Sequence, residues 1–280
     1  MKTRLIALDI DGTLLDDAGR LPPDNVTALK TCADRGIIIA LASGRMFDCI
    51  TPTARALGID CALIGYNGAK VQARMAEARE TVCHDPLPAA FADTVVAYCR
   101  EHSFQLNYYL DDVLYSRTDP ALRKYSDLYS AQTGARYSFV DSLDRFQGRS
   151  PTKLILITDP SHRDATRTRD HQYEYFSTRL PGDVYQVKTN PEYLEFLHRG
   201  ADKGAGLHKL AEFYGVQNSD TVAFGDGEND VEMLAGAGTG VALANAKERT
   251  KRAAHITLEW NNNQAGVARY LEKQGLGIRG

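Results

Sequence analysis

A short apolar run that leads directly into two aspartates constrains the fold of this 280-residue chain more than any other stretch. Leu5–Leu8 is continuously apolar and is followed by Asp9-Ile10-Asp11-Gly12-Thr13. A short apolar run bounded by a turn is typical of a parallel strand that is covered on both faces. Ligands of open α/β sheets bind beyond the carboxyl ends of such strands. The stretch therefore predicts a buried strand with functional carboxylates at its end.

Asp9 and Asp11 would point to the same side if the strand continued through both of them, because strand side chains alternate. Their repulsion would then be relieved by a divalent cation, or by a proton kept on one carboxylate while the other stays ionised. A plain polar turn is the alternative. A calcium-binding EF-hand loop is disfavoured, because its glycine is the sixth residue and a helix precedes it, whereas Gly12 is the fourth residue and follows a strand.

The same pattern recurs further along the chain. The apolar run 37–42 ends in Ser43-Gly44-Arg45, and a predicted helix over 23–36 separates it from the first run. A strand, helix and strand in this order require parallel pairing with a right-handed crossover, which puts Ser43 on the same edge as Asp9. There the Ser43 hydroxyl could donate to a phosphate oxygen, Gly44 would let the backbone come close, and Arg45 could bind a second anionic group. A plain turn is the alternative for Ser43-Gly44.

A third repeat consists of a predicted helix over 48–57 and the apolar run 61–64, which ends in Gly65-Tyr66-Asn67-Gly68. Asn-Gly is also a strong hairpin-turn dipeptide. Asn67 is therefore predicted either to contact a substrate or to shape a turn.

The composition excludes several classes of function. With 43% hydrophobic and 25% charged residues and a net charge of −3, the chain is typical of a soluble globular protein without an affinity for nucleic acid or anionic membranes. No apolar stretch suits a signal peptide or a membrane helix. The five cysteines include no Cys-x-x-Cys pair, so neither a disulfide framework nor a zinc site is expected, and the reducing cytoplasm is the predicted location.

From residue 82 the pattern changes to alternating, aromatic-rich strands and longer helices. The predicted elements are strands over 105–109, 113–115, 153–158, 184–188 and 193–197 and a polar helix over 161–180. The segment is far too long for a loop. It is predicted to be an inserted α+β domain over 82–199, while 1–81 and 200–280 form the α/β core with a Rossmann-like parallel sheet.

The α/β pattern returns at Asp202, which is predicted to cap a helix that begins near Lys203. A cation in the first turn opposes the helix dipole, so an anion should compensate Lys203, and a phosphate bound at the helix amino end would do so. A lysine in solvent or paired with Asp202 is the alternative. The run Thr221–Phe224 is then followed by Gly225-Asp226-Gly227-Glu228-Asn229-Asp230. These acids either complete a magnesium site begun by Asp9 and Asp11 or form a solvated turn.

The four clusters in this order, Asp-x-Asp-Gly-Thr, Ser-Gly-Arg, Asp-Lys-Gly and Gly-Asp-Gly-Glu-Asn-Asp, resemble the motifs of the haloacid dehalogenase superfamily. The large insertion and the closing segment Gly240–Ala246 are similar to the Cof-type sugar-phosphate phosphatases. The resemblance implies a magnesium-dependent phosphatase that acts on small phosphorylated metabolites through an aspartyl-phosphate. It assigns no oligomeric state. Ala244 departs from the branch, which often has a longer side chain at this position, where the wall of the pocket would lie.

Carried onto matching positions, the resemblance makes Asp9 the nucleophile and a metal ligand, and Asp11 the general acid/base and a ligand through its carbonyl. Ser43, Gly44 and Lys203 would hold the phosphoryl group, and Asp226 would bind magnesium. The supporting or substrate-binding positions would be Arg45, Asn67, Asn229 and Asp230.

Three alternatives stay open: a phosphomutase, a phospho-aspartate signalling module without turnover, and a non-catalytic scaffold. The inserted domain is expected to act as a lid that selects the leaving group. Its candidate substrate contacts are Tyr108, Tyr185, Lys188 and Glu195.

Overall fold

The computed structural model describes residues 3–75 and 80–277. The chain divides into a core unit, Met1–His84 with Ala201–Gly280, and an inserted unit, Asp85–Gly200. The sequence analysis predicted that the inserted domain begins at residue 82. Residues 82–84 instead belong to a strand that pairs with the core sheet, which moves this border to Asp85.

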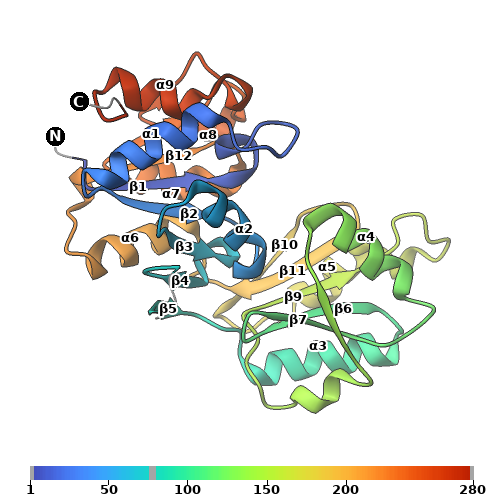
Figure 1. Cartoon of the computed structure of the whole chain (residues 1–280). Coiled ribbons are helices and arrows are strands. Elements are labelled where there is room, and N and C mark those ends of the chain that lie inside the picture. The colour runs from blue at the N-terminus through green and yellow to red at the C-terminus, as the bar shows by residue number, and fades with distance from the viewer. Residues whose placement is uncertain (1–2, 76–79, 278–280) are drawn as a thin grey trace. The chain divides into compact units, whose positions relative to one another are not determined.

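The core unit contains an eight-stranded sheet in the order β14-β13-β12-β1-β2-β3-β4-β5 (Figure 1). The strands from β14 to β3 are parallel, and β4 and β5 add an antiparallel edge. The predicted α/β fold with a parallel core sheet is therefore confirmed. The strands are β1 (Leu5–Asp9), β2 (Ile38–Ala42), β3 (Ala62–Gly65), β4 (Lys70–Gln72), β5 (Thr81–His84), β12 (Thr221–Gly225), β13 (Thr239–Ala242) and β14 (Ile256–Thr257).

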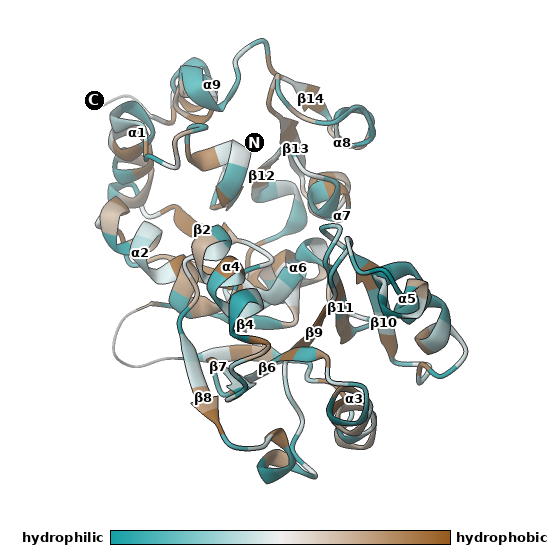
Figure 2. Ribbon diagram, turned by 90° about the vertical axis from the view of Figure 1, so that its right-hand side faces the viewer, coloured by the Kyte–Doolittle hydropathy of each residue, from teal (hydrophilic) through white to brown (hydrophobic). Residues whose placement is uncertain are grey.

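Helices cover both faces of this sheet. Apolar side chains of α1 (Pro23–Asp34), α2 (Phe47–Leu57) and α9 (Gly266–Lys273) pack on one face. Those of α6 (Lys203–Phe213) and α7 (Val231–Gly236) pack on the other, and α8 (Glu248–Ala253) follows β13. Every residue of β1 is buried, as expected for a central parallel strand. Figure 2 shows the same difference between strands and helices in hydropathy: β2 is largely apolar, while the helices carry polar residues as well.

The inserted unit has its own six-stranded sheet in the order β10-β11-β9-β6-β7-β8, in which only β7 and β8 pair in parallel among the described strands. Helices α3 and α5 pack on one face through a separate apolar core. Hydroxyl contacts between Tyr129 of α4 and Tyr109 of β6 join α4 to the opposite face. The elements are α3 (Ala89–Glu101), β6 (Gln105–Leu110), β7 (Val113–Arg117), α4 (Arg123–Thr133), β8 (Tyr137–Val140), β9 (Lys153–Ile157), α5 (Arg169–Ser177), β10 (Val184–Lys188) and β11 (Tyr193–His198).

The helix predicted over 161–180 was wrong in its length, because α5 spans only Arg169–Ser177. Side chains of Asp159, Asp164 and Thr168 accept hydrogen bonds from backbone N–H groups two or three residues further on. Such local bonds compete with the helix and favour turns. No helix among the described residues is both long enough and apolar enough to cross a membrane.

Candidate active site

The proposed site residues follow the ends of neighbouring parallel strands of the core sheet. Asp9 ends β1, and its partner in the register is Ala42, which ends β2 and precedes Ser43. On the other side of β1, Leu8 pairs with Phe224 of β12, which leads into Asp226. Parallel register therefore brings these segments to one edge, as the sequence pattern predicted.

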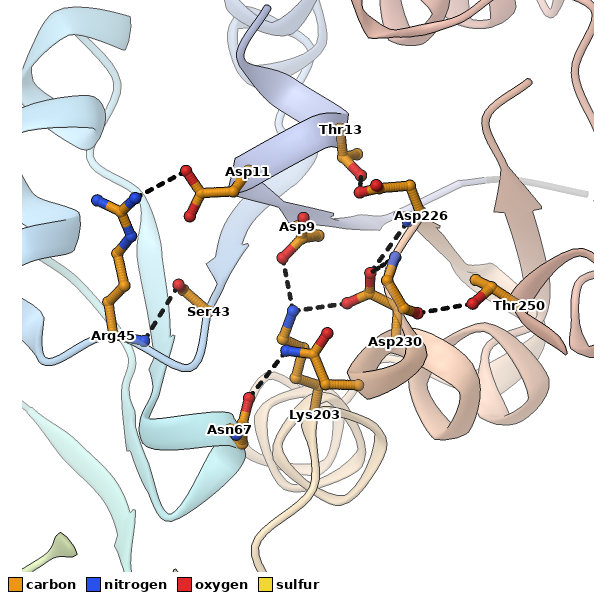
Figure 3. A network of polar contacts seen from close by, with 12 residues as sticks. Asp9, Asp11, Thr13, Ser43, Arg45, Asn67, Lys203, Asp226, Asp230 and Thr250 are labelled. Carbon is orange, nitrogen blue, oxygen red and sulfur yellow. Dashed lines mark hydrogen bonds and ion pairs between the residues drawn. The ribbon is translucent and has the colours of Figure 1, made fainter. Parts of the chain in front are cut away.

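Lys203 lies at the centre of a buried ion-pair cluster (Figure 3). Its Nζ donates to Oδ1 of Asp9 at 2.5 Å and to Oδ1 of Asp230 at 2.6 Å. The lysine is 0% exposed and begins α6, where the Asp202 side chain caps the helix by accepting from the Ala205 N–H at 2.7 Å. Two carboxylates of the protein compensate the charge of Lys203. The phosphate expected at this helix end stays a prediction.

Burial and the neighbouring charges shift the pKa values of Asp9 and Lys203. Burial raises the pKa of Asp9 to about 8, with a further contribution from the Asp230 charge, and Lys203 offsets these effects only in part. Burial acts to lower the pKa of Lys203, but the two carboxylates outweigh it and hold this pKa above its usual range. The carboxylates of Asp9, Asp226 and Asp230 thus share one lysine, and this arrangement favours a bound proton or a further cation.

Asp230 organises the loop between β12 and α7. While Oδ1 of Asp230 binds Lys203, its Oδ2 accepts from the N–H groups of Asp226 at 3.0 Å and of Gly227 at 2.8 Å. Asp230 is 0% exposed, so these bonds fully enclose its carboxylate. Its position fits a role in supporting Lys203 and the loop.

Asp226 reaches the same pocket from that loop. Its Oδ1 accepts from the Thr13 hydroxyl at 2.7 Å, which connects the loop after β12 to the turn after β1. Burial raises the pKa of Asp226, while the Thr13 hydrogen bond lowers it. Among the described residues, carboxylate oxygens of Asp9, Asp226 and Asp230 all lie within 4.8 Å of one another.

This donor set fits magnesium. Mg²⁺ is a hard cation that takes carboxylate oxygens and keeps several waters, and the pocket offers carboxylates in excess of its one lysine. Asp230 is 0% exposed and accepts three hydrogen bonds, from Lys203 and from two backbone N–H groups, whereas each oxygen of Asp226 has a single donor. Asp9 and Asp226 are therefore the better candidates for direct side-chain ligands.

The side chains of Asp11 and Asp9 do not point to the same side, because β1 ends at Asp9. The chain then turns through Ile10–Leu14, where Gly12 has a φ of 81°. The Asp11 side chain is 54% exposed, and its Oδ1 accepts from Nη2 of Arg45 at 2.8 Å. The two carboxylates therefore have different surroundings, one buried beside Lys203 and one exposed beside Arg45.

Ser43 is buried after β2, and its Oγ accepts from the Arg45 N–H at 3.2 Å, so the hydroxyl hydrogen can still be donated. A Cβ at Gly44 would lie 2.9 Å from Oδ1 of Asn67, so any larger residue would force the Asn67 side chain to shift. Asn67 has a φ of 54° in the turn between the antiparallel strands β3 and β4, as its hairpin alternative predicted. Its Oδ1 also accepts from Nδ2 of Asn229 at 3.1 Å.

Three further residues contact these groups although the sequence analysis did not select them as site residues. Thr13 and Asn245 bond to the Asp226 carboxylate, and the Thr250 hydroxyl donates to the Gly227 carbonyl at 2.7 Å. Thr13 and Asn245 stand within segments that the family resemblance used, but spacing alone carries no sign of their partners.

Among the candidates in the inserted unit, Tyr108 was a wrong choice. Its side chain is 1% exposed within the apolar core of that unit, and its hydroxyl donates to the Arg149 carbonyl at 3.2 Å. Glu195 forms a nearly buried ion pair with Lys153 at 2.7 Å, and Lys188 pairs with Asp170 at 2.8 Å. Tyr185 is partly buried on β10.

Comparison with known proteins finds phosphatases of similar length. Pyridoxal phosphate phosphatase YbhA of Escherichia coli (strain K12) is 27% identical over 275 residues, which cover 97% of this chain and 98% of that protein. The phosphatase YitU of Bacillus subtilis (strain 168), named for 5-amino-6-(5-phospho-D-ribitylamino)uracil, is 27% identical over 97% of each chain. An HMP-PP phosphatase of Escherichia coli O6:H1 is 30% identical over 96% of this chain and 94% of its own length.

Solved structures share the fold over the same extent. A protein of Thermotoga maritima matches with a TM-score of 0.86 and 30% identity over 97% of each chain. A haloacid dehalogenase-like hydrolase of Bacteroides thetaiotaomicron has the same TM-score of 0.86 at 26% identity, over 98% of this chain and 100% of that one. A model of the haloacid dehalogenase-like hydrolases matches residues 6–271, so the chain belongs to that family, as the resemblance of its four motifs implied.

Proposed function

We propose that this chain is a magnesium-dependent phosphatase that hydrolyses small phosphorylated metabolites, sugar phosphates among them, through an aspartyl-phosphate on Asp9. The observation that carries the proposal is the buried Asp9–Lys203–Asp230 cluster with the Asp226 carboxylate beside it. A carboxylate nucleophile, a cation for the phosphoryl oxygens and ligands for a metal are the parts that phosphoryl transfer requires. The names of the curated relatives, which are phosphatases of small phosphorylated compounds, support the same reading.

In this mechanism the phosphoryl group binds between Lys203 and Ser43. Lys203 occupies Oδ1 of Asp9, so attack on phosphorus is assigned to Oδ2. Bound magnesium would be held by Asp9, Asp226 and the Asp11 carbonyl, and its positive charge would counter the burial and the Asp230 charge that favour a protonated Asp9.

Asp11 acts as the general acid/base. Its exposed carboxyl group gives a proton to the leaving oxygen while the bond from phosphorus to that oxygen breaks. It then takes a proton from the water that attacks the aspartyl-phosphate, and inorganic phosphate leaves. Before substrate binds, the Arg45 ion pair holds the Asp11 side chain in a defined position.

The inserted unit is proposed to select the leaving group, because every phosphate monoester presents the same head group to Asp9, Ser43 and Lys203. The five cysteines all lie within the described residues and form no disulfide there, which supports a reducing compartment such as the cytoplasm.

The test is phosphate release from a panel of phosphorylated metabolites, with magnesium and with EDTA. Asp9→Asn should abolish release, and Asp11→Asn should slow it by at least about 10²-fold, as lost acid/base catalysis does. Asp24→Asn, on the exposed surface of α1, is the matched control and should behave as wild type. Near-wild-type release by pure Asp9→Asn would contradict the proposal, and return of the phosphoryl group to a second position of the substrate would indicate the alternative, a phosphomutase.

A further inference from the structure

Residues 243–250 of the core unit, which begin within the closing segment Gly240–Ala246 and continue into α8, run along the loop that carries Asp226. Three successive carbonyls of that loop accept hydrogen bonds from these residues. The Leu243 N–H donates to Gly225 at 3.3 Å, the Lys247 N–H to Asp226 at 3.0 Å, and the Thr250 hydroxyl to Gly227 at 2.7 Å. The loop is therefore held on its carbonyl side by residues 243–250 and on its N–H side by Asp230.

Asn245 extends from this segment to two groups near the nucleophile. Its Nδ2 donates to the Gly12 carbonyl at 2.8 Å and lies 3.4 Å from Oδ2 of Asp226. Since Thr13 donates to Oδ1, each oxygen of the Asp226 carboxylate has one donor. Two donors on opposite oxygens fix the rotation of a carboxylate, and this rotation decides where its remaining lone pairs point.

The Asn245 amide is itself held in one orientation. Its Oδ1 accepts from the Asn262 N–H at 3.2 Å, which requires Nδ2 to face Gly12 and Asp226. Asn262 is 1% exposed, and its Nδ2 donates to the Leu15 carbonyl at 3.0 Å and to Oδ1 of Asp17 at 2.9 Å. Asn245 and Asn262 thus connect the closing segment to the turn after β1.

The space at this junction is tight. A Cβ at Gly12 would lie 2.5 Å from Oδ2 of Asp226, so the carboxylate packs directly on the glycine. A small rotation of the carboxylate would lose either the Thr13 or the Asn245 hydrogen bond.

We propose that Asn245 is a positioning residue that sets the orientation of the Asp226 carboxylate and thereby the affinity of the site for a divalent cation. This inference rests on the proposed function, because it concerns the magnesium site of the same reaction. Groups that hydrogen-bond to metal ligands typically change metal affinity or activity by about 10–100-fold when they are removed. Asn245 does not touch the reacting atoms in this role.

The experiment measures Mg²⁺ binding by isothermal titration calorimetry on the full chain, without substrate. Asn245→Ala should raise the dissociation constant by about 10–100-fold. Asn263→Ala is the matched control, because Asn263 is an exposed asparagine near Asn262 that bonds only to Asp17 among the described residues. Its dissociation constant should equal that of wild type.

Asn245→Ser gives a second variant with a polar side chain that is too short to span Gly12 and Asp226, and it should weaken binding as Asn245→Ala does. A purely structural role would lower the fraction of sites that bind while leaving the dissociation constant of those sites unchanged. The inference would be overturned by such a loss of binding sites without a change in the dissociation constant. It would also be overturned if Asn245→Ala left Mg²⁺ binding unchanged, or if Asn263→Ala weakened it equally. If wild type itself bound no Mg²⁺, the metal requirement of the proposed function would fail, which is a different result.

Discussion

Replacing Lys203 with methionine should destabilise the core unit strongly, because it leaves buried carboxylates without their cation. Lys203 is 0% exposed and lies between Asp9 at 2.5 Å and Asp230 at 2.6 Å. Methionine has a similar length, so the packing changes little while the charge is removed. Breaking a buried ion pair by removing one partner destabilises by about 3–5 kcal/mol.

The pH dependence of this loss follows from the remaining acids. Without Lys203, the folded protein can relieve the charge by binding one proton more on its buried aspartates than the wild type does, in which the pKa of Asp9 is already raised to about 8. This uptake costs about 1.4 kcal/mol for each pH unit above the ordinary carboxyl pKa near 4, which gives roughly 5 kcal/mol at pH 8 and under 2 kcal/mol at pH 5. Since the folded state then binds more protons than the unfolded state, the variant should lose stability as the pH rises through this range.

The assay is urea unfolding in EDTA at pH 8 and pH 5, followed by a signal from the core unit. Lys203→Met should lose about 3–5 kcal/mol at pH 8 and clearly less at pH 5. Lys251→Met is the matched control, because Lys251 pairs at 3.4 Å with Glu248, whose side chain is 78% exposed. Such surface pairs contribute about 0–1 kcal/mol.

A second comparison tests the cause. Asp230→Asn combined with Lys203→Met removes one of the uncompensated carboxylates, so the double variant should be more stable than the sum of the single losses predicts, by about 0.5–3 kcal/mol. If Lys203→Met cost under about 1 kcal/mol at pH 8, as surface pairs do, the argument from buried charge would be refuted. Strictly additive losses would refute the coupling between Lys203 and Asp230.

Two further predictions concern the thiols and the inserted unit. Burial raises the pKa of Cys61 to about 12 and of Cys32 to about 11, and Cys99 is shifted upward in the same way. In a titration with Ellman's reagent, only the partly buried Cys49 and Cys83 should therefore react quickly in the folded protein, and rapid reaction of a third thiol would contradict this. Replacing Asp85–Gly200 with a short Gly-Ser linker should broaden substrate choice and slow the best substrates, measured in preparations whose circular dichroism shows a folded core. An unchanged ranking at unchanged rates would argue against a role in specificity.

Sequence reasoning located the strand ends well, because continuous apolar runs mark parallel strands directly. Strands β1, β2, β3 and β12 lie within a residue or so of the predicted runs. Lys203 was placed in the first turn of its helix for a local reason, the cap at Asp202. The order of these elements, with crossovers of one hand, then fixed which residues share an edge.

Side-chain partners across the chain could not be predicted in this way. The sequence does not tell which of the three acids Asp226, Glu228 and Asp230 turns inward, yet Glu228 is exposed while Asp230 is buried on Lys203. Likewise, the local sequence allowed the first strand to continue as far as Asp11. It ends at Asp9 in the structure, with Gly12 at positive φ and Arg45 paired with Asp11. These outcomes depend on contacts between segments far apart in sequence.

The position of β1 in the sheet has a consequence for synthesis of the chain. This strand lies between β2, which follows it closely, and β12, which begins only at Thr221. The Asp9–Lys203 ion pair likewise spans 194 residues, which a ribosome adds in about 10–40 s at 5–20 residues per second. During that time one edge of β1 has no partner strand, whereas Asp85–Gly200 is contiguous and can fold as soon as it emerges. We therefore expect a nascent chain arrested before Thr221 to contain a folded inserted unit and a core sheet with one open, unpaired edge, and chaperones would bind first to that edge.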